Sequence, residues 1–424
     1  MAKRVSDEPA EAVPAARRRR LLLLVGLAAA AVAAGWFAGP WWVAARASTS
    51  LEDRRPEDAL DWLDRGERWF GTHAETAALR VRALRKAGRA AEFAETLSAA
   101  QEAGVDAERL RREVVFAKAS GGGFAEVVGE LPALLEDPRG DEREILESFA
   151  NGAVANYRIE EAEPLIEAWR SRFPGDPRAD LLAGRVEEHK GQWDAAVALY
   201  EAALENEPGY GPAAYNLARV KLNRKKPEEA LAAYETAAAW PGCELPAAAG
   251  RAHCLRLLGR PNEARDALAM LKDADPAEAE RQFRRVGQTA LAARTAYLAE
   301  LGRIELEAGN PAAAADLLGR AVEANPRDQT LRYLLSRALT ADGRAEEAGP
   351  HLDFYKEASA ATGRLDGLME RLRADPKNAD LRAEIGAIFL KYLSEPQGRV
   401  WLKSALAYDP DNEAAQDALR GAGG

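Results

Sequence analysis

Apolar and small residues recur at helical spacing through Pro177–Tyr210, and they predict a pair of helices. The first helix carries Gly184, and a turn follows at residues 190–192. The second helix begins at Trp193, and Pro208 ends it. Small residues stand where the two helices would cross, and aromatic residues stand beside them. One such pair cannot cover its own apolar faces, so we expect copies of it on either side.

Copies of this unit follow one another through most of the chain with a period of 34 residues. We expect a connecting half-repeat at residues 44–73, a first array at 74–278, a second array at 295–412, and a capping helix with a tail at 413–424. The units expected to be complete are Ala74–Ala107, Glu108–Asp141, Arg143–Asp176, Pro177–Tyr210, Gly211–Glu244, Leu245–Glu278, Thr295–Asp328, Gln329–Thr362 and Ala379–Asn412.

The period is interrupted twice. Pro276 and Pro326 are 50 residues apart, as are Pro326 and Pro376, so each interval exceeds one period by 16 residues. Sixteen residues are enough for one further helix. We therefore expect an inserted helix at residues 279–294 and a second one within residues 357–375.

The 34-residue phase, with alanine at the expected helix crossings, resembles the tetratricopeptide repeat family over residues 56–420. The resemblance implies an all-α fold, a right-handed superhelical solenoid of helix pairs whose concave face binds proteins or peptides. Pro227, Pro311 and Ala345 stand where the family often has an aromatic residue, and Gly398 stands where alanine is usual. We expect looser packing at these four sites. The competing fold is a looser helical bundle.

The N-terminal residues have a different pattern. Residues 1–20 are polar and basic, and we expect a disordered cytoplasmic tail. Residues 21–43 carry no charge, and as a helix they would span about 34 Å, enough to cross a bilayer. Arg17–Arg20 precede this run, which predicts a single-pass membrane protein with a cytoplasmic N-terminus and periplasmic repeats. Three tryptophans that favour the membrane interface follow at its far end, Trp36, Trp41 and Trp42.

Other interpretations of the apolar run stay open. It could be a secretory signal that is cleaved after Ala45-Arg46-Ala47, or a twin-arginine signal that begins at Arg17–Arg20. Gly35 and Gly39 form a GxxxG motif, which can pack two membrane helices and would lead to self-association. An alanine-rich segment also contains such spacing by chance.

The charge balance narrows the class of partner. The formal net charge is −10, and residues 1–20 hold six basic and three acidic side chains, which leaves −13 for the rest of the chain by subtraction. An acidic body argues against nucleic acid as a partner. Cys243 and Cys254 form no CxxC or zinc pattern. Buried thiols, a disulfide, and a metal site with His253 are the alternatives for them.

The sequence contains no motif of a known active site. We find no His-Glu-x-x-His, no Gly-x-Ser-x-Gly and no phosphate-loop Gly-Lys pattern. Each histidine falls in a different unit, without a second metal ligand at helical spacing. We therefore predict that the protein is not an enzyme and holds no cofactor or metal ion. The histidines are His73, His189, His253 and His351.

In the family, the first helix of each unit lines the concave groove, and the resemblance implies ligand-binding residues there. Five of the nine residues at unit position 9 are arginine. Stacked guanidinium groups would form a basic strip for carboxylates, and neighbouring tyrosines could pack an extended peptide. An arginine-rich sequence also places arginine on any exposed face, and this alternative stays open. The predicted groove residues are Arg82, Asn151, Arg185, Tyr215, Arg219, His253, Arg303, Tyr333 and Arg337.

Together these patterns predict a non-catalytic scaffold or adaptor in the bacterial cell envelope. Its partner would be a protein or an extended peptide, and the arginines favour an acidic one. The chain resembles membrane-anchored bacterial tetratricopeptide proteins. The alternatives are an accessory subunit that presents substrate to a separate envelope enzyme, and a structural homo-oligomer.

Overall fold

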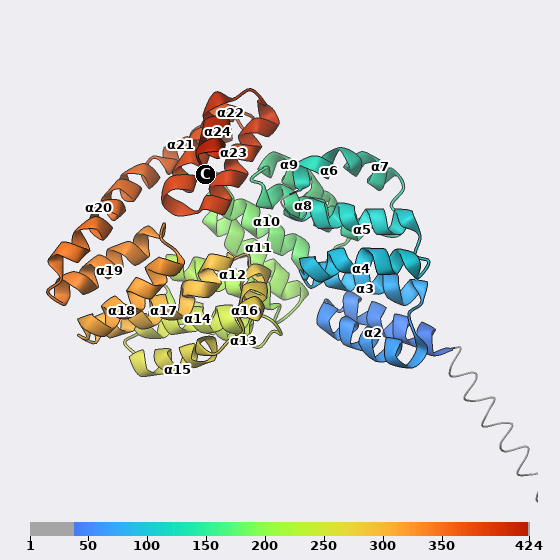
Figure 1. The fold of residues 1–424 in the computed structure, drawn as a ribbon, viewed down its shortest axis with the longest axis horizontal. Coiled ribbons are helices and arrows are strands. Elements are labelled where there is room, and N and C mark those ends of the chain that lie inside the picture. Colours follow the sequence, from blue (N-terminus) through green and yellow to red (C-terminus); the bar gives the residue numbers. More distant parts are fainter. Residues whose placement is uncertain (1–37, 122, 423–424) are drawn as a thin grey trace, which may run out of the picture. The chain divides into compact units, whose positions relative to one another are not determined.

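The computed structural model describes residues 38–121 and 123–422, and every regular element among them is a helix (Figure 1). This confirms the predicted all-α repeat fold. The chain divides into two compact units, of which unit 1 ends at Val114 and unit 2 begins at Val115. The boundary between them falls within one helix, α5 (Ala107–Ala119).

The described part of unit 1 starts with an antiparallel pair of helices. Residues 38–52 form the first helix, in which Gly39 lies against the ring of Phe70 and Val43 lies against Gly66. The structure therefore has a complete helix pair where we predicted a half-repeat at residues 44–73. The further helices of unit 1 are α2 (Pro56–Phe70), α3 (Ala74–Lys86), α4 (Ala90–Glu102) and the first part of α5.

The predicted membrane-spanning segment lies mostly outside the described residues, as do the predicted tail at 1–20 and Gly35. Its last six residues, 38–43, belong to the helix that packs on α2, where the side chain of Val43 is buried. Protein contacts therefore cover part of a stretch that we assigned to the bilayer. Among the described residues, no helix combines the length and the apolar character needed to span a membrane.

Unit 2 contains the remaining helices. The predicted pair at residues 177–210 is confirmed as α10 and α11, with the expected turn between them. The helices that follow α5 are α6 (Phe124–Val127), the 3-10 helix η1 (Val128–Glu130), α7 (Leu131–Glu136), α8 (Glu142–Ala155), α9 (Ile159–Arg172), α10 (Pro177–His189), α11 (Trp193–Asn206), α12 (Gly211–Asn223), α13 (Pro227–Ala238), α14 (Glu244–Leu257), α15 (Pro261–Lys272), α16 (Pro276–Arg285), α17 (Ala290–Glu307), α18 (Pro311–Ala324), α19 (Gln329–Ala341), α20 (Ala345–Thr362), α21 (Leu365–Ala374), α22 (Ala379–Ile388), the π-helix η2 (Phe389–Leu393), α23 (Glu395–Tyr408) and α24 (Glu413–Gly421).

Both predicted inserts are present as helices. The first is α16, which ends at Arg285, so residues 290–294 of the predicted insert belong to α17 instead. A glycine with a positive φ of 81°, Gly287, makes the turn between these helices. The second insert is α21, which lies within the predicted range.

The departures from the family pattern do not all loosen the packing. Pro227 and Pro311 stand in the first turn of α13 and α18, where their missing N–H costs no hydrogen bond. Gly398 faces the backbone of Leu390 in η2, and a Cβ atom at this position would collide with it. The expectation of loose packing at Gly398 is therefore wrong, because the absent side chain permits a close approach.

Small residues of one helix face large side chains of its partner throughout unit 2. A Cβ atom on Gly184 of α10 would lie 2.5 Å from the ring of Tyr200 on α11. A Cβ atom on Gly302 of α17 would likewise lie 2.7 Å from the side chain of Leu318 on α18. These contacts allow the helices to cross closely, and the large side chain then covers the crossing.

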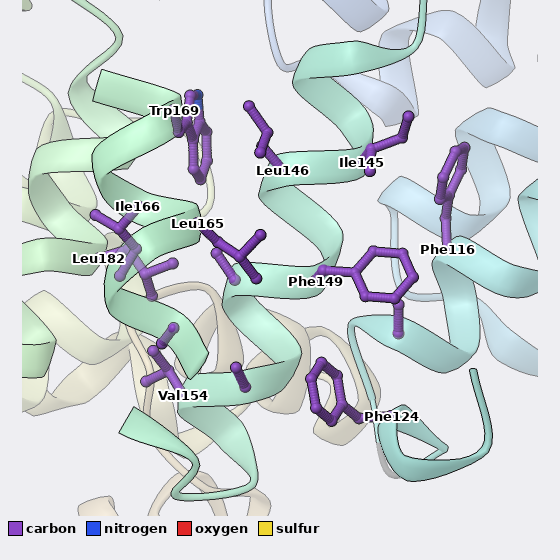
Figure 2. Packing of buried hydrophobic residues seen from close by; sticks show 14 of the residues in the cluster. Phe116, Phe124, Ile145, Leu146, Phe149, Val154, Leu165, Ile166, Trp169 and Leu182 are labelled. Atoms are coloured by element: carbon purple, nitrogen blue, oxygen red, sulfur yellow. The ribbon is translucent and has the colours of Figure 1, made fainter. Parts of the chain in front are cut away.

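The largest core cluster of unit 2 joins the end of α5 to α10 (Figure 2). Figure 2 shows Phe124 and Phe149 facing each other, and their ring centroids are 6.2 Å apart at an interplanar angle of 66°. Trp169 of α9 lies in the same cluster and is 1% exposed. The cluster passes without a break from one helix pair to the next, as expected of stacked repeats.

Unit 2 also closes on itself. The ring of Trp401, in the last repeat, stacks on Tyr157, in the turn between α8 and α9, with centroids 4.4 Å apart. The buried Arg382 donates to the Tyr157 carbonyl at 3.2 Å, and Tyr408 donates to the Glu161 carboxylate at 3.2 Å. More than 200 residues separate these partners in the sequence. We call this set of five residues the closure contact.

The helix crossings give a direct test of stability. Replacing Gly184→Ala places a methyl group against the ring of Tyr200, which sits in a closed core. We expect a loss of about 1–3 kcal/mol in the free energy of unfolding, measured by urea denaturation. Gly319→Ala is the matched control, because Gly319 lies in α18 with open space at its Cβ position, and alanine there favours the helix by roughly 0.5–1 kcal/mol. Equal effects of the two substitutions would contradict the account.

Candidate functional site

A cavity of about 520 Å³ lies inside unit 2, and we call it the inner cavity. Helices α10 and α12, the loop before α17 and the start of α23 supply most of its wall. It is a polar site, with two guanidinium groups, a carboxylate, an imidazole and several amides. These groups belong to Arg185, Glu188, His189, Asn216, Arg219, Gln288 and Gln397.

Arg219 is fixed in this wall by an ion pair with Glu188. One nitrogen of its guanidinium, Nη2, lies 2.6 and 2.5 Å from the two carboxylate oxygens. The same nitrogen donates to the side chain of Asn216 at 3.2 Å. Tyr200 donates a hydrogen bond to Glu188 from the other side. The Nε atom of Arg219 is buried and has no hydrogen-bond partner among the described residues.

Arg185 differs from Arg219 because it has no hydrogen-bond or ion-pair partner among residues 38–121 and 123–422. Burial, followed by the like charge of Arg219, lowers its pKa. Its guanidinium group lies 3.3 Å from the point where a Cβ atom on Gly287 would stand. An unpaired charge in a partly buried position is costly, and an anion in the cavity would offset that cost.

His189 follows Arg185 by one helical turn and faces both cavities of this region. Burial within the closed unit, together with the charges of Arg185 and Arg219, lowers the pKa of His189 to about 4. The imidazole is therefore neutral near pH 7, and the positive charge of the wall comes from the two arginines. A bound anion would raise this pKa again.

A second cavity, of about 450 Å³, adjoins the closure contact. Both cavities are lined by Tyr157, Glu188 and His189, so these side chains lie where the two cavities meet. Leu372 and Trp401 give this cavity a more apolar wall than that of the inner cavity. The closure contact therefore contributes Tyr157 to both cavities, and Arg382 and Trp401 to the second one.

The predicted groove residues His253 and Arg303 share one buried carboxylate. Glu300 is 3% exposed, and one of its oxygens lies 3.3 Å from His253 Nδ1 and 2.8 Å from Arg303 Nη1. Arg256 pairs with the other oxygen at 2.5 Å. Burial alone would raise the pKa of Glu300, but His253 and the two arginines outweigh burial and lower it. These two predicted groove residues therefore already interact with a carboxylate inside the protein.

Arg82, in unit 1, is also ion-paired with a buried glutamate. Its Nε atom lies 2.6 Å from Glu113, and Arg85 lies 2.7 Å from the other oxygen of that carboxylate. Glu113 is 2% exposed. Burial opposes its charge, but Arg85 and Arg82 together lower its pKa. The ion cluster stabilises the packing of α3 on α5 and leaves Arg82 without the free donors that a ligand needs.

Two further predicted residues also serve the fold. Tyr215 is 7% exposed, and its ring packs edge-on against Tyr234 at 5.4 Å. The prediction that it packs a peptide is wrong, because it is part of the core. Asn151 donates to the backbone carbonyl of Glu147 at 2.8 Å in its own helix.

Tyr333 and Arg337 remain at the surface of α19. The Tyr333 ring lies 4.7 Å from that of Tyr355, and the guanidinium group of Arg337 lies over Tyr333 at 5.9 Å. Neither residue lines the inner cavity. Of the nine predicted residues, only Arg185 and Arg219 come together in one cavity.

The sequence prediction overlooked the acidic partners of the arginines. Glu113 follows Arg82 by 31 residues, and Glu188 precedes Arg219 by 31 residues. This spacing is one repeat less one helical turn, which places the two charges on adjacent first helices at the same level. A search for acids at this spacing would have identified both pairs.

The cysteines and possible metal ligands add no second site. Cys243 and Cys254 are free and buried, and burial raises the pKa of each thiol to about 12. In the part of the chain that the structure describes, no group of three or more His, Cys, Asp or Glu side chains is placed to hold a metal ion.

Two family models described as tetratricopeptide repeat match the chain. One matches residues 187–242 and 305–372, and the other matches residues 148–212. No curated protein matches the sequence significantly.

Several solved structures resemble the chain at low identity. The Cut9–Hcn1 hetero-tetramer of the APC/C has 15% identity and a TM-score of 0.45 over 87% of this chain and 67% of that one. PilW, a type IV pilus biogenesis factor, has 19% identity and a TM-score of 0.40 over 49% of this chain and 90% of its own. A tetratricopeptide repeat protein from Parabacteroides merdae has 16% identity and a TM-score of 0.36 over 67% and 99%. TM-scores below 0.5 carry no argument about function.

The buried Glu300 cluster predicts a dependence of stability on pH. Glu300→Gln leaves two arginines near a neutral side chain, and we expect a loss of about 3–5 kcal/mol in the free energy of unfolding at pH 7. Because the folded-state pKa of Glu300 is lowered, its contribution is complete above the ordinary carboxyl pKa of about 4.3 and is lost as the pH falls below it. The difference between wild type and variant should therefore shrink below that pH in urea titrations.

Glu307→Gln is the control for this prediction. Glu307 pairs with the same Arg256 at 2.6 Å, but its side chain is 56% exposed. Its loss should cost less than about 1 kcal/mol. Equal losses for both variants, or a difference that does not change with pH, would contradict the assignment.

Proposed function

We propose that this chain is a non-catalytic adaptor that binds an acidic segment of a protein partner in its inner cavity. The proposal is supported by the match of residues 148–212, 187–242 and 305–372 to models of the tetratricopeptide repeat. Tetratricopeptide repeats in general mediate protein–protein interaction and scaffolding. The acidic character of the partner is inferred from the side chains of the cavity.

The observation that carries this proposal is the unpaired guanidinium group of Arg185. It lines the inner cavity beside Arg219, whose Nε atom is buried and also has no partner among the described residues. The two guanidinium groups offer donors that match a carboxylate, whereas the Asn216 amide already donates to the backbone carbonyls of Pro212 and Val286. Glu188 forms an ion pair with only one of the two arginines. A carboxylate of a partner would complete the charge balance of the cavity.

The size of the cavity limits what enters it. A volume of about 520 Å³ lies in the range of small-ligand sites and suits a few side chains of a peptide, not a folded domain. The partner would therefore insert a chain end or a loop. Binding in place of catalysis is supported by the roles of the cavity residues, because Glu188 is held by Arg219 and Tyr200 and is not free to act as a base.

We place this adaptor in the bacterial cell envelope, held by a membrane anchor. Residues 21–37 carry no charge and follow Arg17–Arg20, which supports an anchor whose N-terminal side is cytoplasmic. The packing of residues 38–43 on α2 limits this anchor to the residues before them. The repeats that follow residue 38 would then lie outside the cytoplasm. A reporter fused after Gly424 that is active only in the cytoplasm would contradict this location.

Removing the charge of Arg185 tests the proposed function. We expect Arg185→Gln to weaken the binding of a fluorescein-labelled, glutamate-rich peptide by roughly 10–100-fold, because one charged hydrogen-bond donor is lost. Fluorescence anisotropy at two salt concentrations measures the effect, and binding should weaken with salt. In the same titration, the peptide should raise the pKa of His189 above its value of about 4, as followed by NMR.

Two controls make the result specific. Arg337→Gln removes an exposed arginine outside the inner cavity, and it should leave peptide affinity unchanged. A glutamine-rich peptide of the same length should not bind the wild-type protein. Equal affinities of Arg185→Gln and wild type for the acidic peptide would refute the proposed site.

A further inference from the structure

Three tryptophans of unit 1 are exposed to an unusual degree. The side chains of Trp41, Trp42 and Trp69 are 74%, 51% and 72% exposed. Among the described residues, the other large apolar side chains with high exposure reach at most 50%, and they lie in unit 2. Indole rings are costly to leave in water, so a group of them at one place calls for a partner.

The antiparallel helix pair brings these tryptophans to one end of unit 1. Gly39 lies against Phe70 and Val43 lies against Gly66, so the first turns of residues 38–52 stand beside the last turns of α2. Trp41 and Trp69 are therefore at the same level along the pair, although 28 residues separate them in the sequence. We call Trp41, Trp42 and Trp69 the tryptophan end of unit 1.

We propose that the tryptophan end lies in the headgroup region of a phospholipid bilayer and holds unit 1 against the membrane surface, an inference that rests on the proposed membrane anchor. The chain enters this end at residue 38, directly after the uncharged residues 21–37. If those residues enter the hydrocarbon, the tryptophan end stands at the interface, where indole rings are preferred.

Two arginines near the tryptophan end are also compatible with a place at the membrane interface. Arg46 lies over the rings of Trp42 and Trp62 at 5.6 and 5.8 Å, and Arg65 lies over Trp62 at 5.4 Å. Guanidinium groups held on aromatic faces can reach lipid phosphates while the rings remain in the interface. Trp69 is the residue that only the folded structure adds to this group.

The depth of Trp69 can be measured in the full chain. The substitution Trp69→Cys provides a site for a thiol-reactive environment-sensitive dye, since Cys243 and Cys254 are buried and burial raises their pKa values to about 12. The labelled protein is reconstituted in vesicles of phosphatidylcholine and phosphatidylglycerol that contain a headgroup spin-labelled lipid. We expect strong quenching of this dye. Met270→Cys, at a 49% exposed side chain of unit 2, is the control and should show little quenching.

The outcomes separate this inference from the proposed anchor. If the protein stays with the vesicles after carbonate extraction but the dye introduced through Trp69→Cys is not quenched, the tryptophan end is not at the interface and the inference fails alone. Shielding of this dye from aqueous iodide without quenching by lipid would show a protein partner instead, and would also overturn it. Release of the protein by carbonate would refute the anchor together with the inference, while peptide binding at Arg185 is measured independently in detergent.

A label-free measurement supports the same test. Trp69→Phe removes one indole without adding a dye, and the difference between its emission spectrum and that of the wild type reports on Trp69 alone. We expect this difference spectrum to be quenched by brominated lipids. An unquenched difference spectrum would contradict the inference even if the labelled variant folded poorly.

Discussion

The closure contact is the interaction on which the interior of unit 2 depends. A stack of repeats in series has two free ends, and its concave face is open to solvent. In this chain Trp401 stacks on Tyr157 and Arg382 donates to the Tyr157 backbone, so the last repeat packs against the turn between α8 and α9. The concave face thereby becomes the wall of two cavities that both include Tyr157. The loop after the inserted helix α16 lines part of the same interior.

The enclosure of its interior changes how strongly each charged side chain inside unit 2 interacts with its surroundings. Several arginines on the first helices are paired with buried glutamates, as in Arg82 with Glu113 and Arg256 with Glu300. These pairs hold successive repeats together and offer little to a ligand. Arg185, on which the proposed function depends, has no such partner among the described residues, and an unpaired charge in a confined cavity attracts an anion more strongly than one on an open surface. The same confinement keeps His189 neutral near pH 7.

The local signals of the sequence predicted the helices well. Pro177 and Trp193 begin helices where we expected them, because a helix start and a turn depend on residues close in the chain. Two of the nine predicted groove residues, Arg185 and Arg219, share the inner cavity. Five of the others have internal partners, which the prediction missed because it considered one position of the repeat at a time.

The closure contact could not be predicted from local sequence signals. It depends on the accumulated rotation of many repeats and on both inserts, and no short pattern in the sequence encodes that sum. The pairing of residues 38–52 with α2 was missed for a related reason. A run without charges is expected of a membrane-spanning helix and also of a helix that is buried against protein. Only Gly39 and Gly66, which give room to Phe70 and Val43, indicate the second alternative here.

A double-mutant cycle between Tyr157 and Trp401 tests the closure contact most directly. The variants Tyr157→Leu, Trp401→Leu and their combination keep an apolar side chain at each position but remove the stacked rings. Urea denaturation of each should give a coupling of about 0.5–1.5 kcal/mol in the free energy of unfolding, because the rings contact each other only when the last repeat returns to the turn between α8 and α9. Additive losses, with no coupling between the two positions, would mean that unit 2 is open and that its inner cavity does not exist in solution.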